Sequence, residues 1–224
     1  MKKYIFIDVD DTILDFHACA EHAIQMGFTE HKIACSDFAE TYHRINDGLW
    51  RALERGEITR QQLYATRFNL VFAELGVDFD GEVFETTFRR NLALTGDKMD
   101  GAEEIMGYLS DKYDVYVTSN APQAQQESRL RIAQLDGYVR GVFTSEQLNV
   151  QKPQKQFFDE CLRRIGNVLA DEVVLIGDSL SADVAGGANA GITTIWFNSK
   201  NIPIPDDFAG DYVISHLTEI KNIL

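Results

Sequence analysis

The sequence is poor in the residues that build disulfide frameworks and thiolate metal centres. Its three cysteines, Cys19, Cys35 and Cys161, lie far apart, and none belongs to a CxxC pair. This spacing argues against a Cys-based zinc site and a dithiol redox centre, and an odd number argues against a disulfide scaffold. We therefore expect reduced thiols and a cytoplasmic location.

Positive charge is also scarce. The chain carries 21 Lys and Arg against 35 Asp and Glu, for a formal net charge of −14. Because an acidic surface repels an extended phosphate backbone, we expect no nucleic acid polymer as a partner. A small phosphate remains a suitable ligand, provided that a metal ion and one or two placed cations reverse the local field.

The first apolar stretch, Tyr4 to Ile7, is too short for a signal peptide or a membrane span, because Asp8 interrupts it. We therefore expect no membrane association. The GxGxxG fingerprint, the P-loop and the GxSxG elbow are missing, and the five histidines form no catalytic arrangement. These absences exclude several common classes of enzyme site.

Short apolar and β-branched runs recur along the chain, and helical segments separate them from the second run onward. Strand, helix and strand in succession imply parallel pairing, so we predict an α/β fold with a doubly wound parallel sheet. Ligands of such sheets bind beyond the carboxyl ends of the strands. The predicted strands are Tyr4–Asp8, Asp114–Thr118, Val142–Thr144, Val173–Gly177, Thr193–Phe197 and Tyr212–Ile214.

The segment between the first two runs contains no convincing strand and carries helical signals instead. Asp37 with Glu40 is a candidate start for one helix, and Thr59 with Gln62 forms a capping box that predicts the start of another. The first of these helices has an apolar stripe at spacings of three and four, formed by Phe38, Tyr42, Ile45, Leu49 and Leu53.

These signals predict an all-helical domain inserted into the α/β domain. We place the helical insert at residues 15–94 and the α/β domain at residues 1–14 and 95–224. Boundaries derived from sequence are uncertain by about 2–4 residues.

Carboxylates follow the first predicted strand directly, in Asp8-Val9-Asp10-Asp11-Thr12. Asp8 and Asp10 are two residues apart and would point to one side of an extended segment, where two like charges need a counter-charge or a shared proton. A simpler interpretation is equally open for this motif alone, since Asp11 or Thr12 can cap a helical turn and acids often end a strand in water.

Three further strand regions end in polar residues, each a weak signal by itself. Ser119 and Asn120 follow the second run, and a hydroxyl beside free backbone N–H groups can hold phosphate, although Ser-Asn is also an ordinary turn. Lys152 precedes a helix, but an isolated lysine is usually solvated. The run Val173–Gly177 leads into Asp178 and then Asp183, which a helix N-terminus also explains.

In combination, the order acid pair, hydroxyl, lysine, acid pair resembles the four-motif signature of the haloacid dehalogenase-like superfamily. The motifs begin at Asp8, Ser119, Lys152 and Gly177, and the resemblance spans nearly the whole chain. It implies a Rossmann-like core, and the helical insert resembles the cap of the family's helical-cap class. An acid at Asp10 favours a phosphatase over a dehalogenase, because an alkoxide needs a proton to leave and a halide does not.

The resemblance also implies roles for individual residues. Mg²⁺ would be held by the carboxylates of Asp8 and Asp178 and the main-chain carbonyl of Asp10, with Asp183 supporting through a water molecule or through the ligands around it. Asp8 would be the nucleophile, and Asp10 the general acid and base. Lys152, Ser119 and Asn120 would bind phosphate. The lack of a His or Cys cluster independently favours Mg²⁺ over zinc.

The predicted cap resembles that of the pyrimidine 5'-nucleotidase branch, in the stretches 42–50, 56–59 and 67–68, as does the closing segment 190–198. It implies a nucleoside monophosphate substrate, with Asn46 and Trp50 as candidate specificity residues, although aromatic residues at helical spacing are more often cap core. Alternatives are a phosphatase of phosphoglycolate or a sugar phosphate, a phosphosugar mutase, or a non-enzymatic phospho-aspartate receiver. We expect a monomer or homodimer.

Overall fold

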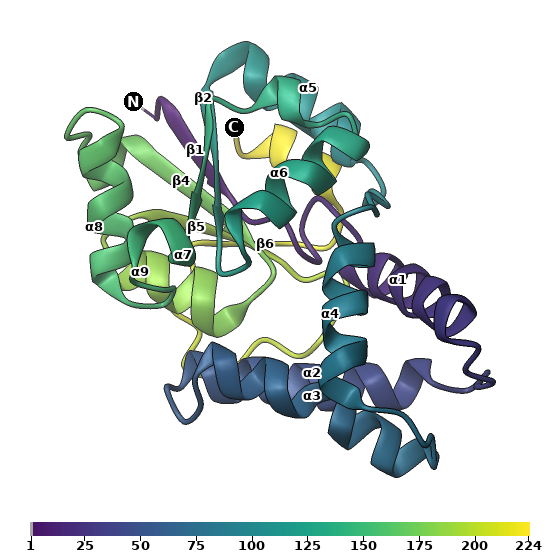
Figure 1. The fold of residues 1–224 in the computed structure, drawn as a ribbon. Coiled ribbons are helices and arrows are strands. Elements are labelled where there is room, and N and C mark those ends of the chain that lie inside the picture. Colours follow the sequence, from purple (N-terminus) through teal and green to yellow (C-terminus); the bar gives the residue numbers. More distant parts are fainter. Residues whose placement is uncertain (1) are drawn as a thin grey trace. The chain divides into compact units, whose positions relative to one another are not determined.

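The structure, a computed structural model, describes residues 2–224. It divides into two compact units, Met1–Asp15 with Gly96–Leu224, and Phe16–Thr95. We call these the core unit and the helical unit. The bounds of the helical unit differ by one residue at each end from the predicted insert. Figure 1 shows that one unit contains the sheet and the other contains helices alone.

The core unit is built on a six-stranded parallel sheet, which confirms the predicted fold class. Its strand order, β3-β2-β1-β4-β5-β6, is that of a doubly wound sheet whose direction of progression reverses beside β1. The strands are β1 (Tyr4–Ile7), β2 (Asp114–Ser119), β3 (Gly141–Thr144), β4 (Val173–Gly177), β5 (Thr193–Phe197) and β6 (Tyr212–Ile214).

Helices cover both faces of this sheet, with α8 and α9 on one side and α5 and α6 on the other (Figure 1). The α-helices are α5 (Ala102–Lys112), α6 (Gln123–Ile132), α7 (Ser145–Leu148), α8 (Lys155–Arg164) and α9 (Gly186–Asn189). The 3-10 helices are η1 (Asp136–Tyr138), η2 (Ala170–Glu172) and η4 (Leu217–Asn222), and η3 (Leu180–Ala185) is a π-helix.

Side chains alternate between the two faces of the sheet, as the period of two requires. Ile5 and Ile7 pack in one core layer with residues of α5 and η4, whereas Phe6 packs in the other with residues of α8. Because both faces are buried, the strands read as nearly continuous apolar runs, which is why they were recognisable in the sequence.

The chain passes between the two units twice. Backbone pairing within the core unit holds these two segments together. The N–H of Asp15 donates to the carbonyl of Asp97 at 2.9 Å, and Leu14 forms an antiparallel bridge with Lys98. The chain therefore leaves and re-enters the core unit at one point.

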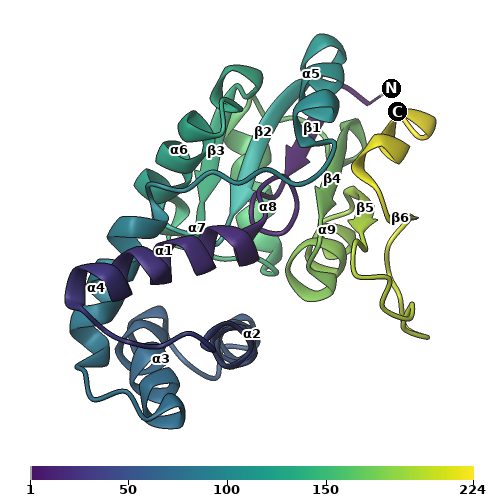
Figure 2. The same cartoon turned by 90° about the vertical axis from the view of Figure 1, so that its right-hand side faces the viewer.

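The helical unit consists of four helices, of which α2 and α3 lie side by side in both views (Figures 1 and 2). Its core is rich in aromatic side chains, including Phe28, Phe68 and Phe84, which lie within 5.3 Å of a neighbouring ring centroid. The helices are α1 (Phe16–His31), α2 (Ala39–Glu54), α3 (Arg60–Leu75) and α4 (Gly81–Leu92).

The two predicted helix starts in this unit had different outcomes. Thr59 caps α3, and its capping box with Gln62 is complete, as predicted. The predicted start with Asp37 was wrong, because α2 begins at Ala39 after Phe38, which makes no side-chain cap hydrogen bond. Phe38 packs edge-on against Phe28, with 5.1 Å between ring centroids, so a buried aromatic ring occupies the position where a polar cap was expected.

Inside the helical unit, Arg67 of α3 and Glu85 of α4 form a buried ion pair. The Arg67 Nη2 and Nε atoms donate to the two Glu85 oxygens at 2.6 and 3.0 Å, and Nη1 donates to Asn46 Oδ1 at 2.8 Å. Burial alone would lower the pKa of Arg67, but Glu85 outweighs it and the pKa lies above its usual value. The bidentate geometry offsets the cost of burying two charges.

Two further findings concern the described chain as a whole. Cys19, Cys35 and Cys161 are free thiols, in agreement with the expectation from their number and spacing. Among the helices of residues 2–224, none combines the length and the apolar character that a membrane span requires.

Replacing Arg67 with Met should destabilise the protein strongly, because Glu85 would remain buried without its partner. We expect the free energy of unfolding in urea to fall by about 3–5 kcal/mol. The control is Arg44→Met, which removes the exposed ion pair of Arg44 with Glu74 in the same unit. That variant should have the same free energy of unfolding as the parent protein. Equal losses of this free energy in both variants would contradict a structural role for the buried pair.

Candidate active site

The site lies where the central strands end. Ile7 of β1 pairs with Val117 of β2 on one side and with Ile176 of β4 on the other. The N–H of Asp8 donates to the Ile176 carbonyl at 2.9 Å, which carries the parallel pairing one residue past the strand. Residues that follow β1, β2 and β4 therefore meet at the edge where parallel sheets bind ligands.

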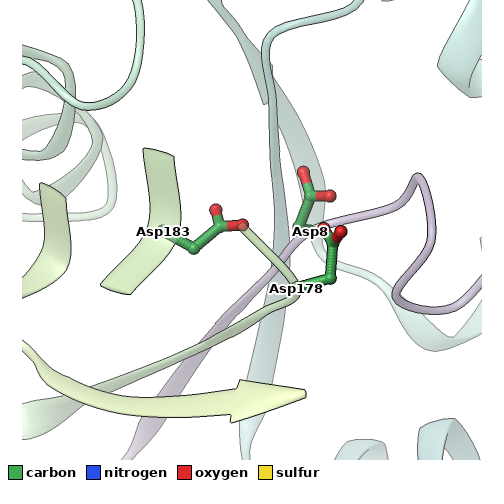
Figure 3. A group of neighbouring side chains, drawn as sticks. All are labelled: Asp8, Asp178 and Asp183. Carbon is green, nitrogen blue, oxygen red and sulfur yellow. The ribbon is translucent and has the colours of Figure 1, made fainter. Parts of the chain in front are cut away.

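Three carboxylates gather at this edge. Asp8, Asp178 and Asp183 each offer one oxygen, and these oxygens lie within 4.8 Å of one another. Figure 3 shows the carboxylates of Asp8 and Asp178 side by side and that of Asp183 turned toward them. The structure thus brings together residues that are distant in the sequence, from both acid motifs.

Lys152 provides the positive charge in contact with this group. Its Nζ atom donates to Asp8 Oδ1 at 2.7 Å, to Asp183 Oδ1 at 2.6 Å and to the Thr118 carbonyl at 3.0 Å. The Lys152 side chain is only 3% exposed. One ammonium against three carboxylates leaves the cluster short of two positive charges.

This imbalance shifts the acid–base equilibria of the cluster. Burial raises the pKa of Asp178 well above its usual value, and repulsion from Asp8 and Asp11 adds to the rise. Burial also raises the pKa of Asp8, against the opposing effect of Lys152. Burial lowers the pKa of Lys152, but Asp183 and Asp8 outweigh it, so the ammonium stays charged.

The donor set fits a hard divalent cation. Carboxylate oxygens are the ligands that Mg²⁺ prefers, and a charge of two would balance the cluster. Among the described residues, this is the one group of three or more His, Cys, Asp or Glu close enough to hold a metal, and it contains no nitrogen or sulfur ligand. Such a composition does not suit zinc.

The loop after β4 is shaped around Asp183. A Cβ atom at Gly177 would lie 2.3 Å from the Asp183 carboxyl group, so only glycine leaves room for this acid. The N–H of Ser179 donates to Asp183 Oδ2 at 3.2 Å. The indole N–H of Trp196 donates to the carbonyl of Asp178 at 2.8 Å and fixes the backbone of the loop.

The side chain of Asn120 is hydrogen-bonded to the loop that contains Lys152. Its Nδ2 donates to the Lys152 carbonyl at 3.0 Å, and its Oδ1 accepts from the Lys152 N–H at 3.0 Å. The nitrogen and the oxygen of the Asn120 side-chain amide thus both bind the backbone of Lys152. Its predicted contact with phosphate is therefore better assigned to its main-chain N–H, and this stays a prediction.

Ser119 is buried at the end of β2. Its Oγ atom accepts from the N–H of Ala121 at 3.1 Å and from Gln126 Nε2 at 2.9 Å. The first bond orders the turn that carries the backbone N–H groups after β2. The hydroxyl keeps its own proton for donation to a ligand, which is the property required for binding a phosphate oxygen.

Asp10 is held by two residues of α6 that sequence reasoning missed. Arg129 Nη1 donates to Asp10 Oδ1, and Gln126 Nε2 donates to Asp10 Oδ2 at 2.7 Å. The signal in the sequence was a polar pair three residues apart on the helix after Ser119. Such a pair usually faces solvent, and only the fold shows that both side chains are buried.

The turn after Asp10 has its own conformational requirement. Asp11 has a φ of 55°, in the left-handed region that Asp and Asn tolerate better than most residues, and its N–H donates to the Leu14 carbonyl at 2.8 Å. The buried hydroxyl of Thr12 has no partner among the described residues, and backbone bonds hold the turn.

The two candidate specificity residues lie on α2 of the helical unit. Asn46 is buried, and its Oδ1 accepts from Arg67, so its side chain supports the buried ion pair. Trp50 lies one turn further along the helix and is half-buried. Of the two, Trp50 has the more accessible surface for a ligand.

Comparison with known proteins agrees with this geometry. Residues 2–191 match the family described as haloacid dehalogenase-like hydrolase. The HAD-hydrolase YfnB of Bacillus subtilis is 37% identical over 227 residues, which cover 100% of this chain and 97% of YfnB. A crystal structure of YfnB bound to magnesium superposes with a TM-score of 0.94 at 36% identity, covering 100% of this chain and 98% of YfnB.

Two further relatives are pyrimidine 5'-nucleotidases. The pyrimidine 5'-nucleotidase PynA of Streptococcus pneumoniae is 35% identical over 202 residues, covering 89% of this chain and 85% of PynA. The pyrimidine 5'-nucleotidase YjjG of Escherichia coli is 29% identical over 223 residues, covering 99% and 97%. Because the family match spans most of the chain and two relatives exceed 30% identity, the chain belongs to the haloacid dehalogenase-like hydrolase family, as its four motifs predict.

Proposed function

We propose that this protein is a magnesium-dependent phosphomonoester hydrolase that works through an aspartyl-phosphate on Asp8. One observation carries the proposal: the buried Asp8 carboxylate lies with two further carboxylates and Lys152, while a second acid, Asp10, is held apart by other partners. The enzyme is a phosphoric monoester hydrolase, in keeping with its family and with PynA and YjjG.

The metal would be held by the carboxylates of Asp8 and Asp178 and by the main-chain carbonyl of Asp10. When bound, Mg²⁺ supplies electrostatic stabilisation to the phosphoryl oxygens. Asp183 contributes by holding Lys152 through Oδ1 and by facing the two other carboxylates. A water molecule between Asp183 and the cation would complete its role.

Asp8 attacks phosphorus, and the bond between phosphorus and the leaving oxygen breaks. Asp10, in its protonated form, donates its proton to that oxygen, so that an alcohol leaves. Asp10 is then a carboxylate and accepts a proton from water, which attacks phosphorus and breaks the bond to Asp8. Inorganic phosphate is released, and both aspartates return to their starting forms.

The other site residues bind and orient the phosphate. Lys152 contacts Asp8 Oδ1 and so neutralises charge at the position that the phosphoryl group approaches. Ser119 offers its hydroxyl proton, and the main chain at Asn120 offers an N–H group. These donors are fixed before substrate arrives, since Ser119 and Lys152 are both buried and hydrogen-bonded.

Asp8→Asn should abolish turnover, because an amide cannot act as the nucleophile. We expect kcat to fall on the order of 10⁴-fold or more, with the fold intact by circular dichroism. Asp111→Asn, an exposed acid on α5, is the matched control and should be fully active. Near-normal phosphate release by purified Asp8→Asn would overturn the mechanism.

Asp10→Asn should slow both chemical steps, since it removes the proton donor of the first and the base of the second. We expect a loss of about 10²–10⁴-fold in kcat. With an activated aryl phosphate the first step needs no proton donor, so acid-quenched samples should contain phosphorylated protein. If no phosphorylated Asp10→Asn protein forms under these conditions, the assignment of Asp10 to water activation is contradicted.

Mg²⁺ should raise the melting temperature of the protein by relieving repulsion among the carboxylates. At a concentration of 100 Kd the stabilisation is about 2.7 kcal/mol. Asp178→Asn should be more stable than the parent without metal, because it removes one buried like charge, and should lose the shift with Mg²⁺. Asp111→Asn is again the control, and a full Mg²⁺ shift in Asp178→Asn would exclude this site.

The substrate we propose is a pyrimidine nucleoside 5'-monophosphate. The support comes from PynA and YjjG, which are pyrimidine 5'-nucleotidases, and Trp50 remains the candidate specificity residue that the sequence predicts. The partner is then a small phosphorylated metabolite, and we place the enzyme in the cytoplasm.

A panel of UMP, dTMP, purine monophosphates, sugar phosphates and phosphoglycolate, assayed with Mg²⁺ and with EDTA, tests this substrate class. We expect the highest kcat/KM for UMP or dTMP and no phosphate release with EDTA. Trp50→Ala should raise KM for the preferred nucleotide more than it lowers kcat. Equal rates across the panel would remove the nucleotidase assignment and leave a phosphatase of another small metabolite.

A further inference from the structure

We propose that Gln126 and Arg129 of α6 are positioning residues that fix the carboxylate of Asp10 and couple it to Ser119. The inference rests on the proposed function and deepens it. The hydrogen bonds of Gln126 and Arg129 described above reach Asp10 and Ser119, and not Asp8, Asp178 or Asp183. Their effect on the reaction would therefore pass through Asp10 and Ser119.

The contacts form one connected network. Gln126 Nε2 lies 2.7 Å from Asp10 Oδ2 and 2.9 Å from Ser119 Oγ, so a single amide group contacts both motifs. Arg129 Nη1 donates to Asp10 Oδ1 and, at 3.2 Å, to Gln126 Oε1. Each oxygen of the Asp10 carboxylate therefore has its own donor, and the two donors also fix each other.

The two donors of the network are more deeply buried than the acid that they hold. Gln126 and Arg129 are fully buried, whereas the Asp10 side chain is 28% exposed. The donors thus reach Asp10 from the protein interior and leave its other side open. A carboxylate has about four lone-pair positions. Those not used by α6 remain available for the leaving oxygen or for water.

Helix geometry explains why one helix can supply both donors. Residues three apart lie on the same face of a helix. Ser119 is the last residue of β2, and α6 begins after the short turn that follows this strand. A fully buried guanidinium is costly unless an acceptor binds it, and the carboxyl group of Asp10 is such a partner. The position of Arg129 is thus explained by the acid that it orients.

Orientation matters here because Asp10 must serve two reaction steps from one place. A general acid or base acts only within hydrogen-bond reach of the atom that gains or loses the proton. A misplacement of about 1 Å can cost on the order of 10²-fold in rate. Donors on both oxygens remove the torsional freedom of the carboxylate before substrate binds.

The experiment compares two substrates whose leaving groups differ in their need for a proton. UMP releases an alkoxide that requires one, and 4-nitrophenyl phosphate releases a stable phenolate. Since kcat/KM covers the steps up to departure of the leaving group, it isolates the first role of Asp10. We expect Arg129→Met to lower kcat/KM on the order of 10²-fold for UMP. For the aryl ester, the fold-loss in kcat/KM should be at least about ten times smaller.

The controls separate positioning from folding. Arg131→Met changes an exposed arginine of the same helix and should leave both rates unchanged. Arg129→Lys keeps a cation and should recover part of the loss with UMP. Gln126→Met removes the shared amide donor and should show the same substrate dependence, so it carries the test if Arg129→Met fails to fold.

A double variant provides the strongest test of coupling through Asp10. Asp10→Asn with Arg129→Met should be no slower with UMP than Asp10→Asn alone, because the positioned group is already gone. Equal losses on both substrates in folded Arg129→Met and Gln126→Met, or additive losses in the double variant, would overturn the inference. A parent enzyme that releases phosphate from neither substrate would instead refute the proposed function.

Discussion

The interaction on which the site depends is the contact of one buried ammonium, Lys152, with the carboxylates of Asp8 and Asp183. Burying this many charges is unfavourable unless each has a partner, and here the acids outnumber the base. The lysine holds the two acids in place but leaves charge to be compensated. A fold that tolerates this shortage is prepared to bind a divalent cation, because the cation supplies the positive charge that the folded chain lacks.

The helical unit shows the opposite use of buried charge. Arg67 and Glu85 balance each other, and the bidentate bonds together with Asn46 occupy the guanidinium. The charges of this pair cancel, so it needs no bound ion to be balanced. The two clusters therefore differ in charge balance more than in burial. This difference distinguishes a site from a structural ion pair more reliably than the presence of charged residues inside the protein.

Local patterns in the sequence were sufficient for the strands and for the acids at their ends. The run Val173–Gly177 is apolar throughout because both of its faces are covered, and the acid that follows must lie at the strand end. The roles of Gln126 and Arg129 were not predictable in this way, since they depend on where α6 packs. The start of α2 also escaped prediction, because burial of Phe38 prevailed over a polar cap.

The pairing of Asp15 with Asp97 makes the insertion of the helical unit a local event in the core chain. Since the two junctions already share a backbone hydrogen bond, a short turn in place of residues 16–95 would span the gap without moving any strand. Evolution can therefore lengthen, exchange or remove what lies between them while the catalytic sheet keeps its register. The helical unit and the sheet that carries the candidate active site are then inherited as separable segments of a single gene.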